Sequence, residues 1–383
     1  MFLALRDLRF ATGRFALMGS VVALISLLLV MLSGLTAGLG GQNTAAIDRL
    51  GEQGVQRLVF GGAAGQEPTA SFTQSEFSVA QRDAWAATDG VASVEPLGVS
   101  QGRAIGLEHP VDTDPQGRAD VSGEPTTGVA TTAFIGLTPG GSDAPAGVEP
   151  GQIVLSQDVA DSLHAQAGDA VAVSGFVYTV ADVVSTEYYS HSPVTWLALE
   201  DWNAISHTAD DAVLGTAGLV RFDAGADVDA VAAAGDDAAG TVAETVKGSY
   251  AALPSYRSEN GSLMTMQGFL YGISALVVIA FLSIWTVQRT RDIAVLKALG
   301  GSNGWVLKDS LAQAAFVLVG GVAVGTGLAA AIGAFAGRAV PFELSWATTA
   351  VPAAGVLVLG MLAAVVAVYR VTRIDPLVAL GGN

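Results

Sequence analysis

The chain has 383 residues, of which 51% are hydrophobic, and a formal net charge of −17. This acidity argues against nucleic acid as a partner, because a phosphate backbone binds basic surfaces. The sequence contains no cysteine, which excludes disulfides, thiolate zinc sites, iron–sulfur clusters and haem attached through a Cys-x-x-Cys-His motif.

Four long apolar runs dominate the sequence, at residues 15–40, 263–287, 311–335 and 346–368. Each can cross about 30 Å of hydrocarbon as a helix, and none has a charge in its centre. The first run is too long for a signal-peptide core and has no clear cleavage site after it, which predicts a retained anchor. We therefore expect an α-helical membrane protein with four transmembrane helices and an α+β extracytoplasmic domain inserted between helices 1 and 2.

Charge predicts the orientation of these helices. The terminal segments and the link between helices 2 and 3 carry nine basic and four acidic residues, a balance of +5, whereas residues 41–263 carry 8 basic and 30 acidic ones, a balance of −22. Basic short loops stay in the cytoplasm. We expect a multi-pass protein of the cytoplasmic membrane, with both termini inside and the large domain outside.

Three parts are predicted along the chain. Residues 1–42 form the cytoplasmic N-terminal segment and transmembrane helix 1, residues 43–258 the extracytoplasmic domain, and residues 259–383 helices 2–4, a cytoplasmic coupling helix (about 289–300) and a short tail. The clearest pattern in the outer domain predicts strands at 55–60, 152–156, 170–174, 176–184, 194–199 and 217–222, and helices at 158–166 and 227–233. Residues 61–75 and 108–127 are rich in Gly, Pro, Thr and Asp and indicate loops.

The link after the second apolar run contains a short amphipathic helix. Ile293, Leu296 and Leu299 fall mostly on one side of it, and Gly300-Gly301 ends it. Such a helix suits docking to a cytoplasmic partner, although a helix resting on lipid has the same pattern.

Two segments resemble a known family. Residues 289–300 follow the pattern Arg-x-x-(Asp/Glu)-Ile-x-x-Leu-(Lys/Arg)-Ala-(Leu/Ile)-Gly, and Asp375-Pro376-x-x-Ala379-Leu380 closes the chain. Together with the three terminal spans, these motifs are similar to those of the permeases that include MacB, LolC and FtsX. The resemblance implies a mechanotransmission ABC transporter, with a permease homodimer in membrane lipid and a separate ATPase subunit that binds ATP and magnesium. The resemblance also implies which residues of this chain contact the ATPase through the coupling helix: Arg291, Ile293, Leu296, Lys297 and Leu299.

Segments 3–10, 32–39, 43–47 and 253–266 resemble, more narrowly, the permeases of the haem-regulated haem exporters. This resemblance implies haem as the transported substrate, with no intrinsic cofactor. The chain has no Gly-x-x-x-x-Gly-Lys-(Ser/Thr) loop to hold phosphates, so we expect a permease subunit that is not itself an enzyme.

A haem site is predicted where the second span begins. Tyr, Glu and Met can all ligate haem iron, an aromatic ring can stack on the macrocycle, and an arginine can pair with a propionate. A carboxylate so near hydrocarbon is costly without a purpose, which singles out Glu259. The candidate ligand-binding residues are Tyr256, Arg257, Glu259, Met264, Met266 and Phe269, with Met31, Asp48 and Glu52 from the first span.

Other interpretations of these residues stay open. Met fills gaps in helix packing and Tyr marks the membrane interface, so each candidate can be purely structural. His191, beside Tyr188 and Tyr189, is an alternative metal or haem ligand or a solvent-side loop residue. Gly34-x-x-x-Gly38 and Gly268-x-x-x-Gly272 allow the close backbone approach that a dimer or gated slit needs. The transported ligand can also be a lipid, lipoprotein or peptide, or the chain can be a non-transporting actuator of a cell-wall hydrolase.

Overall fold

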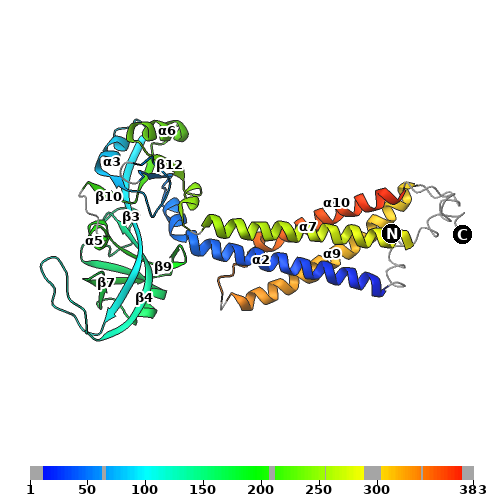
Figure 1. Cartoon of the computed structure of the whole chain (residues 1–383), viewed down its shortest axis with the longest axis horizontal. Helices are drawn as coiled ribbons and strands as arrows, with labels where there is room; N and C mark the ends of the chain where they lie inside the picture. The colour runs from blue at the N-terminus through cyan, green and yellow to red at the C-terminus, as the bar shows by residue number, and fades with distance from the viewer. Residues whose placement is uncertain are drawn as a thin grey trace, which may run out of the picture. The chain divides into compact units, whose positions relative to one another are not determined.

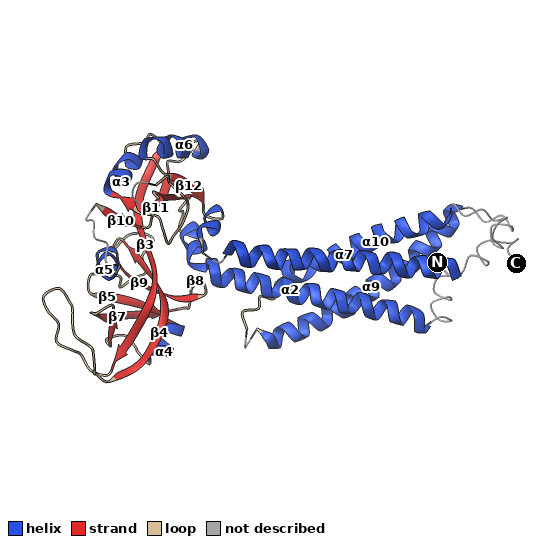
Figure 2. Cartoon of the chain, viewed as in Figure 1, coloured by secondary structure: helices blue, strands red, loops and turns tan. Residues whose placement is uncertain are grey.

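The computed structural model describes residues 12–62, 66–206, 212–254, 256–288, 303–337 and 340–372. The chain divides into two compact units. Gly40–Glu259 forms a β-rich unit, and Met1–Leu39 together with Asn260–Asn383 forms a helical unit (Figures 1 and 2).

Within the residues that the structure describes, the helical unit contains four helices that are long and apolar enough to cross a membrane, as the sequence predicts. In Figure 1 successive helices run in alternating directions along the bundle, which suits spans joined by short links. The α-helical part of the predicted fold is therefore confirmed. The helices are α2 (Thr12–Glu52), α7 (Tyr256–Gln288), α9 (Asn303–Ala336) and α10 (Trp346–Thr372).

Two of these helices extend beyond the apolar runs that predicted them. α2 continues without a break to Glu52 because Ala46, Ile47 and Leu50 recur on one helical face and are buried in a core of the β-rich unit. α7 begins at Tyr256, so its polar first turn precedes the predicted span. Both polar extensions carry candidate site residues.

Small residues let α2 and α9 approach closely within the helical unit. A Cβ atom at Gly325 would collide with the backbone carbonyl of Ala23. Across the same contact, the hydroxyls of Ser26 and Thr326 share a hydrogen bond of 3.3 Å. Close backbone packing and interhelical hydrogen bonds hold helices together where lipid removes the hydrophobic driving force. The α2–α9 contact therefore depends on the absence of a side chain at Gly325.

We expect Gly325→Ala to destabilise the helical unit by about 1–3 kcal/mol, because the added methyl group forces two backbones apart. Gly327→Ala is the matched control, since a Cβ at that position meets nothing within 4 Å. Thermal unfolding of the purified protein in detergent measures the difference. Equal midpoints for the two variants would contradict the packing described for α2 and α9.

The β-rich unit is organised on one large mixed sheet, with strands in the order β12-β1-β11-β3-β4-β9-β5-β7-β6, and β8 pairs with β9 beside it. A small second sheet pairs β2 with β10. This α+β unit confirms the predicted fold class. Its strands are β1 (Arg57–Phe60), β2 (Phe77–Ser78), β3 (Val91–Leu107), β4 (Thr126–Leu137), β5 (Gln152–Ser156), β6 (Ala170–Val173), β7 (Phe176–Val184), β8 (Tyr188–Tyr189), β9 (Ser192–Ala198), β10 (Val213–Gly215), β11 (Ala217–Phe222) and β12 (Val242–Thr245). Its helices are α3 (Val79–Ala86), α4 (Gln157–Leu163), α5 (Leu199–Ile205), α6 (Val228–Ala239) and the 3₁₀ helix η1 (Gly248–Ala252).

The long strand β3 joins two lobes of this unit. Its first half pairs with β11, next to β1 and β12, and a core containing Trp85 lies there. Its second half pairs with both β4 and β6, so β3, β4, β9, β5, β7 and β6 close into a ring of strands. Apolar side chains such as Phe134 and Leu155 fill a core against this ring. Figure 2 shows β3 running through both lobes.

The strands β3 and β4 are the longest in the unit, and neither is among the predicted elements. Both are interrupted by glycines, which lower strand propensity. The structure explains these glycines by close approach: a Cβ at Gly98 or Gly136 would collide with the Trp202 side chain, which packs there from α5. The predicted strands and the helix predicted at 158–166 are present within a few residues of their expected bounds, whereas the helix predicted at 227–233 continues to Ala239.

Candidate functional site

The first turn of α7 carries the carboxylate of Glu259 into a polar cluster of the β-rich unit. Glu259 Oε2 lies 2.9 Å from Asn43 Nδ2 on α2 and 2.8 Å from His191 Nε2 in the β8–β9 turn. The two nitrogens are 3.0 Å apart. The His191 and Glu259 side chains are 31% and 39% exposed, so a ligand can reach them. Residues from three separate elements thus meet at one carboxylate oxygen.

The turn that presents His191 is conformationally costly. Ser190 and His191 join β8 to β9 with φ of 46° and 63°, a region that favours glycine. Two-residue hairpin turns of this kind normally use Asn-Gly, and left-handed backbone costs other residues roughly 1–2 kcal/mol each. The turn is fastened to α2, because the N–H groups of Ser190 and His191 donate to the carbonyls of Asn43 and Gln42. The turn thus holds the His191 side chain beside Glu259 at a cost in backbone energy.

Asp48, a candidate from the first span, is held by neighbours in the β-rich unit. Its carboxylate accepts hydrogen bonds from the Tyr250 hydroxyl and from Thr44 Oγ1, the latter at 2.9 Å. Burial raises the pKa of Tyr250, and the hydrogen bond and charge of Asp48 raise it further. The rings of Tyr250 and Tyr256 pack edge to face at 5.5 Å. Asp48 and Tyr256 therefore belong to one packed group, which is separate from the hydrogen bonds of Glu259.

Glu52 ends α2 in an exposed position, beside a half-buried ion pair. Arg49 Nε lies 3.6 Å from Glu187 Oε1, and its guanidinium lies 5.4 Å from the centre of the Trp196 ring. Burial raises the pKa of the Glu187 carboxyl, the charge of Arg49 opposes this rise, and the charge of Glu52 adds to it. These residues hold the end of α2 in the β-rich unit.

Three of the remaining candidates on α7 lie in the helical unit, and their side chains are exposed. Met264, Met266 and Phe269 are 62%, 53% and 68% exposed, and a Cβ at Gly268 or Gly272 would meet nothing within 4 Å. Arg257, in the first turn of α7, is also exposed. Met31 on α2 is half-buried. The side chains of Met264, Met266 and Phe269 lie on different sides of α7, and the described residues leave all three exposed.

The glycine pair on α2 is packed against neighbouring residues, unlike the pair on α7. Cβ atoms at Gly34 and Gly38 would collide with Phe342 and Pro341, in the segment between α9 and α10. The backbone N–H of Glu343 also donates to the carbonyl of Gly34 at 3.0 Å. Gly34-x-x-x-Gly38 thus packs against its own chain, which corrects the expectation that this pair serves a dimer or slit. Gly268-x-x-x-Gly272 stays open for one.

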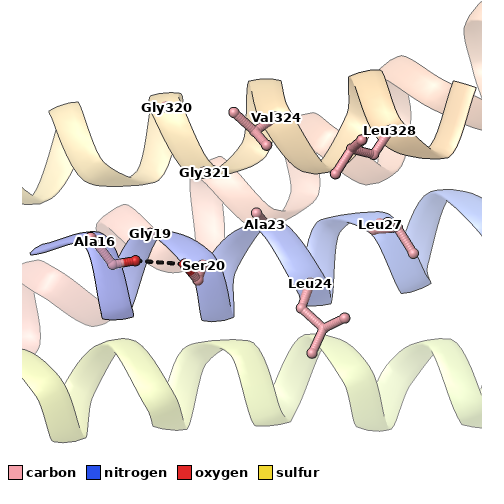
Figure 3. Close-up of a pocket in the computed structure, with 10 residues that line it drawn as sticks. All are labelled: Ala16, Gly19, Ser20, Ala23, Leu24, Leu27, Gly320, Gly321, Val324 and Leu328. Carbon is pink, nitrogen blue, oxygen red and sulfur yellow. Dashed lines mark hydrogen bonds between the residues drawn. The ribbon is translucent and has the colours of Figure 1, made fainter. Parts of the chain in front are cut away.

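A groove lies between α2 and α9 in the helical unit (Figure 3). Its volume is about 530 Å³, and its walls are apolar, with Gly19 and Gly321 at the base and Leu24 and Leu328 among the lining residues. The hydroxyl of Ser20 turns away to the carbonyl of Ala16, at 2.8 Å. The groove therefore offers no charged group or free hydroxyl to a polar ligand.

The predicted coupling residues, Arg291, Ile293, Leu296, Lys297 and Leu299, lie outside the described residues. Among the residues that the structure does describe, no group of three or more His, Cys, Asp or Glu side chains could hold a metal ion. The pairing of Glu259 with His191 was not predicted. The sequence could have indicated a tight turn at Ser190-His191. It could not have indicated that this turn contacts Glu259, which is distant in the chain.

Comparison with known proteins points to one family. Residues 264–376 match the family of FtsX-like permease C-terminal domains. Over their full lengths, the chain is 22% identical to a protein of Staphylococcus epidermidis named as a putative hemin transport system permease, HrtB. It is also 29% identical, over 31% of each chain, to the uncharacterized ABC transporter permease YknZ of Bacillus subtilis.

Two solved structures align with part of the chain. The extracellular domain of the YknZ transporter from Gram-positive bacteria aligns with a TM-score of 0.31 and 14% identity, over 48% of this chain and 95% of that one. The periplasmic region of MacB from Actinobacillus actinomycetemcomitans aligns with a TM-score of 0.34 and 11% identity, over 50% of this chain and 89% of that one.

Proposed function

We propose that this chain, which belongs to the FtsX-like family of ABC transporter permeases, expels haem from the membrane. The observation that carries the proposal is the Glu259 carboxylate, in the first turn of α7 just before the exposed Met264, Met266 and Phe269. Full-length similarity to a protein named for hemin transport supports the same ligand.

The chemistry of haem fits this part of α7. Haem is a flat and largely apolar ring that partitions into a bilayer, and its iron needs an electron-pair donor. The exposed apolar side chains of α7 suit the ring, Glu259 or a methionine can supply the donor, and Arg257 can pair with a propionate. The open Gly268-x-x-x-Gly272 edge allows a second copy to approach, so the ligand would lie laterally in a permease homodimer.

Energy for export comes from a separate ABC ATPase in this proposal. Closure of the ATPase pair would draw the coupling helices together and close the spans on the ligand. Transport in one direction requires that the closed state bind haem more weakly than the open state does, because a conformational change moves a ligand only through such a difference in affinity.

Titration of the purified protein with haemin tests the proposal. A saturable Soret band, shifted from that of free haemin in the same detergent, is expected. Iron-free protoporphyrin IX is the control, because it shares the apolar ring but cannot be ligated through iron. Absence of any protein-dependent Soret change would refute haem as the ligand and leave a lipid, lipoprotein or peptide.

The proposed orientation puts the β-rich unit outside the cell. We expect Ser142→Cys, at an exposed position of that unit, to react with an impermeant thiol reagent on intact cells. Ser302→Cys, in the link after α7, should react only after the cells are opened. The chain has no cysteine of its own, so each label reports a single site. Labelling of position 302 on intact cells would contradict this topology.

A further inference from the structure

We infer that His191 and Asn43 are positioning residues that hold the Glu259 carboxylate toward the ligand, an inference that rests on the proposed function. The polar cluster of Asn43, His191 and Glu259 joins α2, the β8–β9 turn and the first turn of α7 within the β-rich unit.

The hydrogen bonds of the cluster leave one carboxylate oxygen available. Both nitrogens approach the same atom, Glu259 Oε2, at 2.9 and 2.8 Å. The contact is favourable when the imidazole carries its proton on Nε2, because Asn43 Nδ2 and His191 Nε2 then both donate to Oε2. The lone pairs of Oε1 remain for a ligand. Carboxylates that ligate metals are commonly oriented in this way by neighbours that donate to them.

The backbone supports a role for the side chain of His191 beyond packing. A turn with φ of 46° and 63° would be filled more easily by glycine, as would many surface turns. Here the backbone N–H groups of Ser190 and His191 fasten the turn to α2, and this places the imidazole ring of His191 against Glu259. The side chains of His191 and Glu259 are both partly exposed, so they meet where a ligand can approach rather than inside a closed core.

The test compares His191→Gly with His191→Gln in haemin titrations. Glycine suits the positive φ, so the fold is kept while the imidazole is lost. We expect haemin affinity to fall on the order of 10-fold in His191→Gly, the range typical for loss of an orienting partner, with a displaced Soret maximum. His191→Gln keeps an amide donor and should restore part of both. His164→Gln is the matched control, because His164 also has a positive φ, of 52°, but lies at the end of α4.

The outcomes separate this inference from the proposed function. If Glu259→Gln alters the haemin spectrum while His191→Gly matches the wild type, the positioning role is wrong and the haem proposal stands. If the wild type gives no Soret change, the haem proposal is wrong. Thermal unfolding then tests separately whether His191 and Glu259 interact. There, the effects of His191→Gly and Glu259→Gln should be non-additive, and strict additivity would overturn the inference as well.

Discussion

Leu296→Asp is expected to release the ATPase from the permease and to abolish coupled ATP turnover. Leu296 lies on the apolar side of the predicted coupling helix, with Ile293 and Leu299. If this side seats in an ATPase, loss of the leucine removes roughly 1–3 kcal/mol of buried contact. An aspartate in its place also buries an unpaired charge, which costs more than the lost contact. Co-purification of the ATPase with the tagged permease measures the release.

Ala294→Asp is the matched control, because position 294 lies on the opposite side of the same helix. It adds the same charge at nearly the same place and should leave the complex intact. The permease must stay folded in both variants, which gel filtration in detergent verifies. Normal ATPase recovery and turnover with Leu296→Asp would contradict the docking assignment and favour a helix that rests on lipid.

The membrane part of the fold could be predicted from the sequence because hydrocarbon imposes a simple rule. A span must satisfy its own backbone hydrogen bonds, so length and apolarity are enough to locate α2, α7, α9 and α10. The ends of α2 and α7 could not be located in this way. Ile47 and Leu50 at the end of α2 pack into a core of the β-rich unit, and Tyr256 in the first turn of α7 packs against the same core. Hydropathy does not register such tertiary contacts.

In the β-rich unit, local patterns predicted short strands and failed for long ones. β7 has a compact run of β-branched and aromatic residues, and its bounds agree with prediction. β3 and β4 carry glycines at the places where Trp202 and the end of α4 approach their backbones. From the sequence alone, such glycines are indistinguishable from turn residues.

In the candidate site, too, local sequence features could be predicted and long-range contacts could not. Glu259 could be selected from the sequence because a carboxylate beside an apolar run is costly. Its bonds to Asn43 and His191 span 216 and 68 positions of the chain, and no periodicity links residues so far apart. Asp48 shows the opposite case, since Tyr250 and Thr44 already occupy its oxygens and leave it less suited to ligate iron.

Among conservative substitutions of the candidate ligands, we expect Glu259→Gln to have the largest effect on bound haem. Removal of a true axial ligand changes the coordination of iron, so the Soret maximum should shift and haemin affinity should fall. Glutamine keeps the volume and the hydrogen-bonding capacity of the side chain, which limits confusion with loss of folding. Cells that carry this variant should also become sensitive to haem.

Three further variants test which side chain is the second axial ligand of the iron, opposite Glu259. They are Met264→Leu, Met266→Leu and Tyr256→Phe. Met264 and Met266 are exposed, so their thioethers are free to turn toward a ligand, whereas the Tyr256 ring already packs on Tyr250. A spectral change is therefore more expected from a methionine variant than from Tyr256→Phe. Met361→Leu on α10, which packs inside the helical unit, is the control for loss of a thioether by itself.

The pattern across the set decides where the ligand lies. A shift with Glu259→Gln and with one methionine variant, but not with Met361→Leu, would assign the iron to the start of α7. Unchanged spectra in Glu259→Gln and the other three variants, with haemin still bound by the wild type, would remove the site from α7. Met31 and the carboxylates of Asp48 and Glu52 on α2, together with His191, would then be the donors to substitute, because a bound iron still needs an electron-pair donor and these are the candidates that remain.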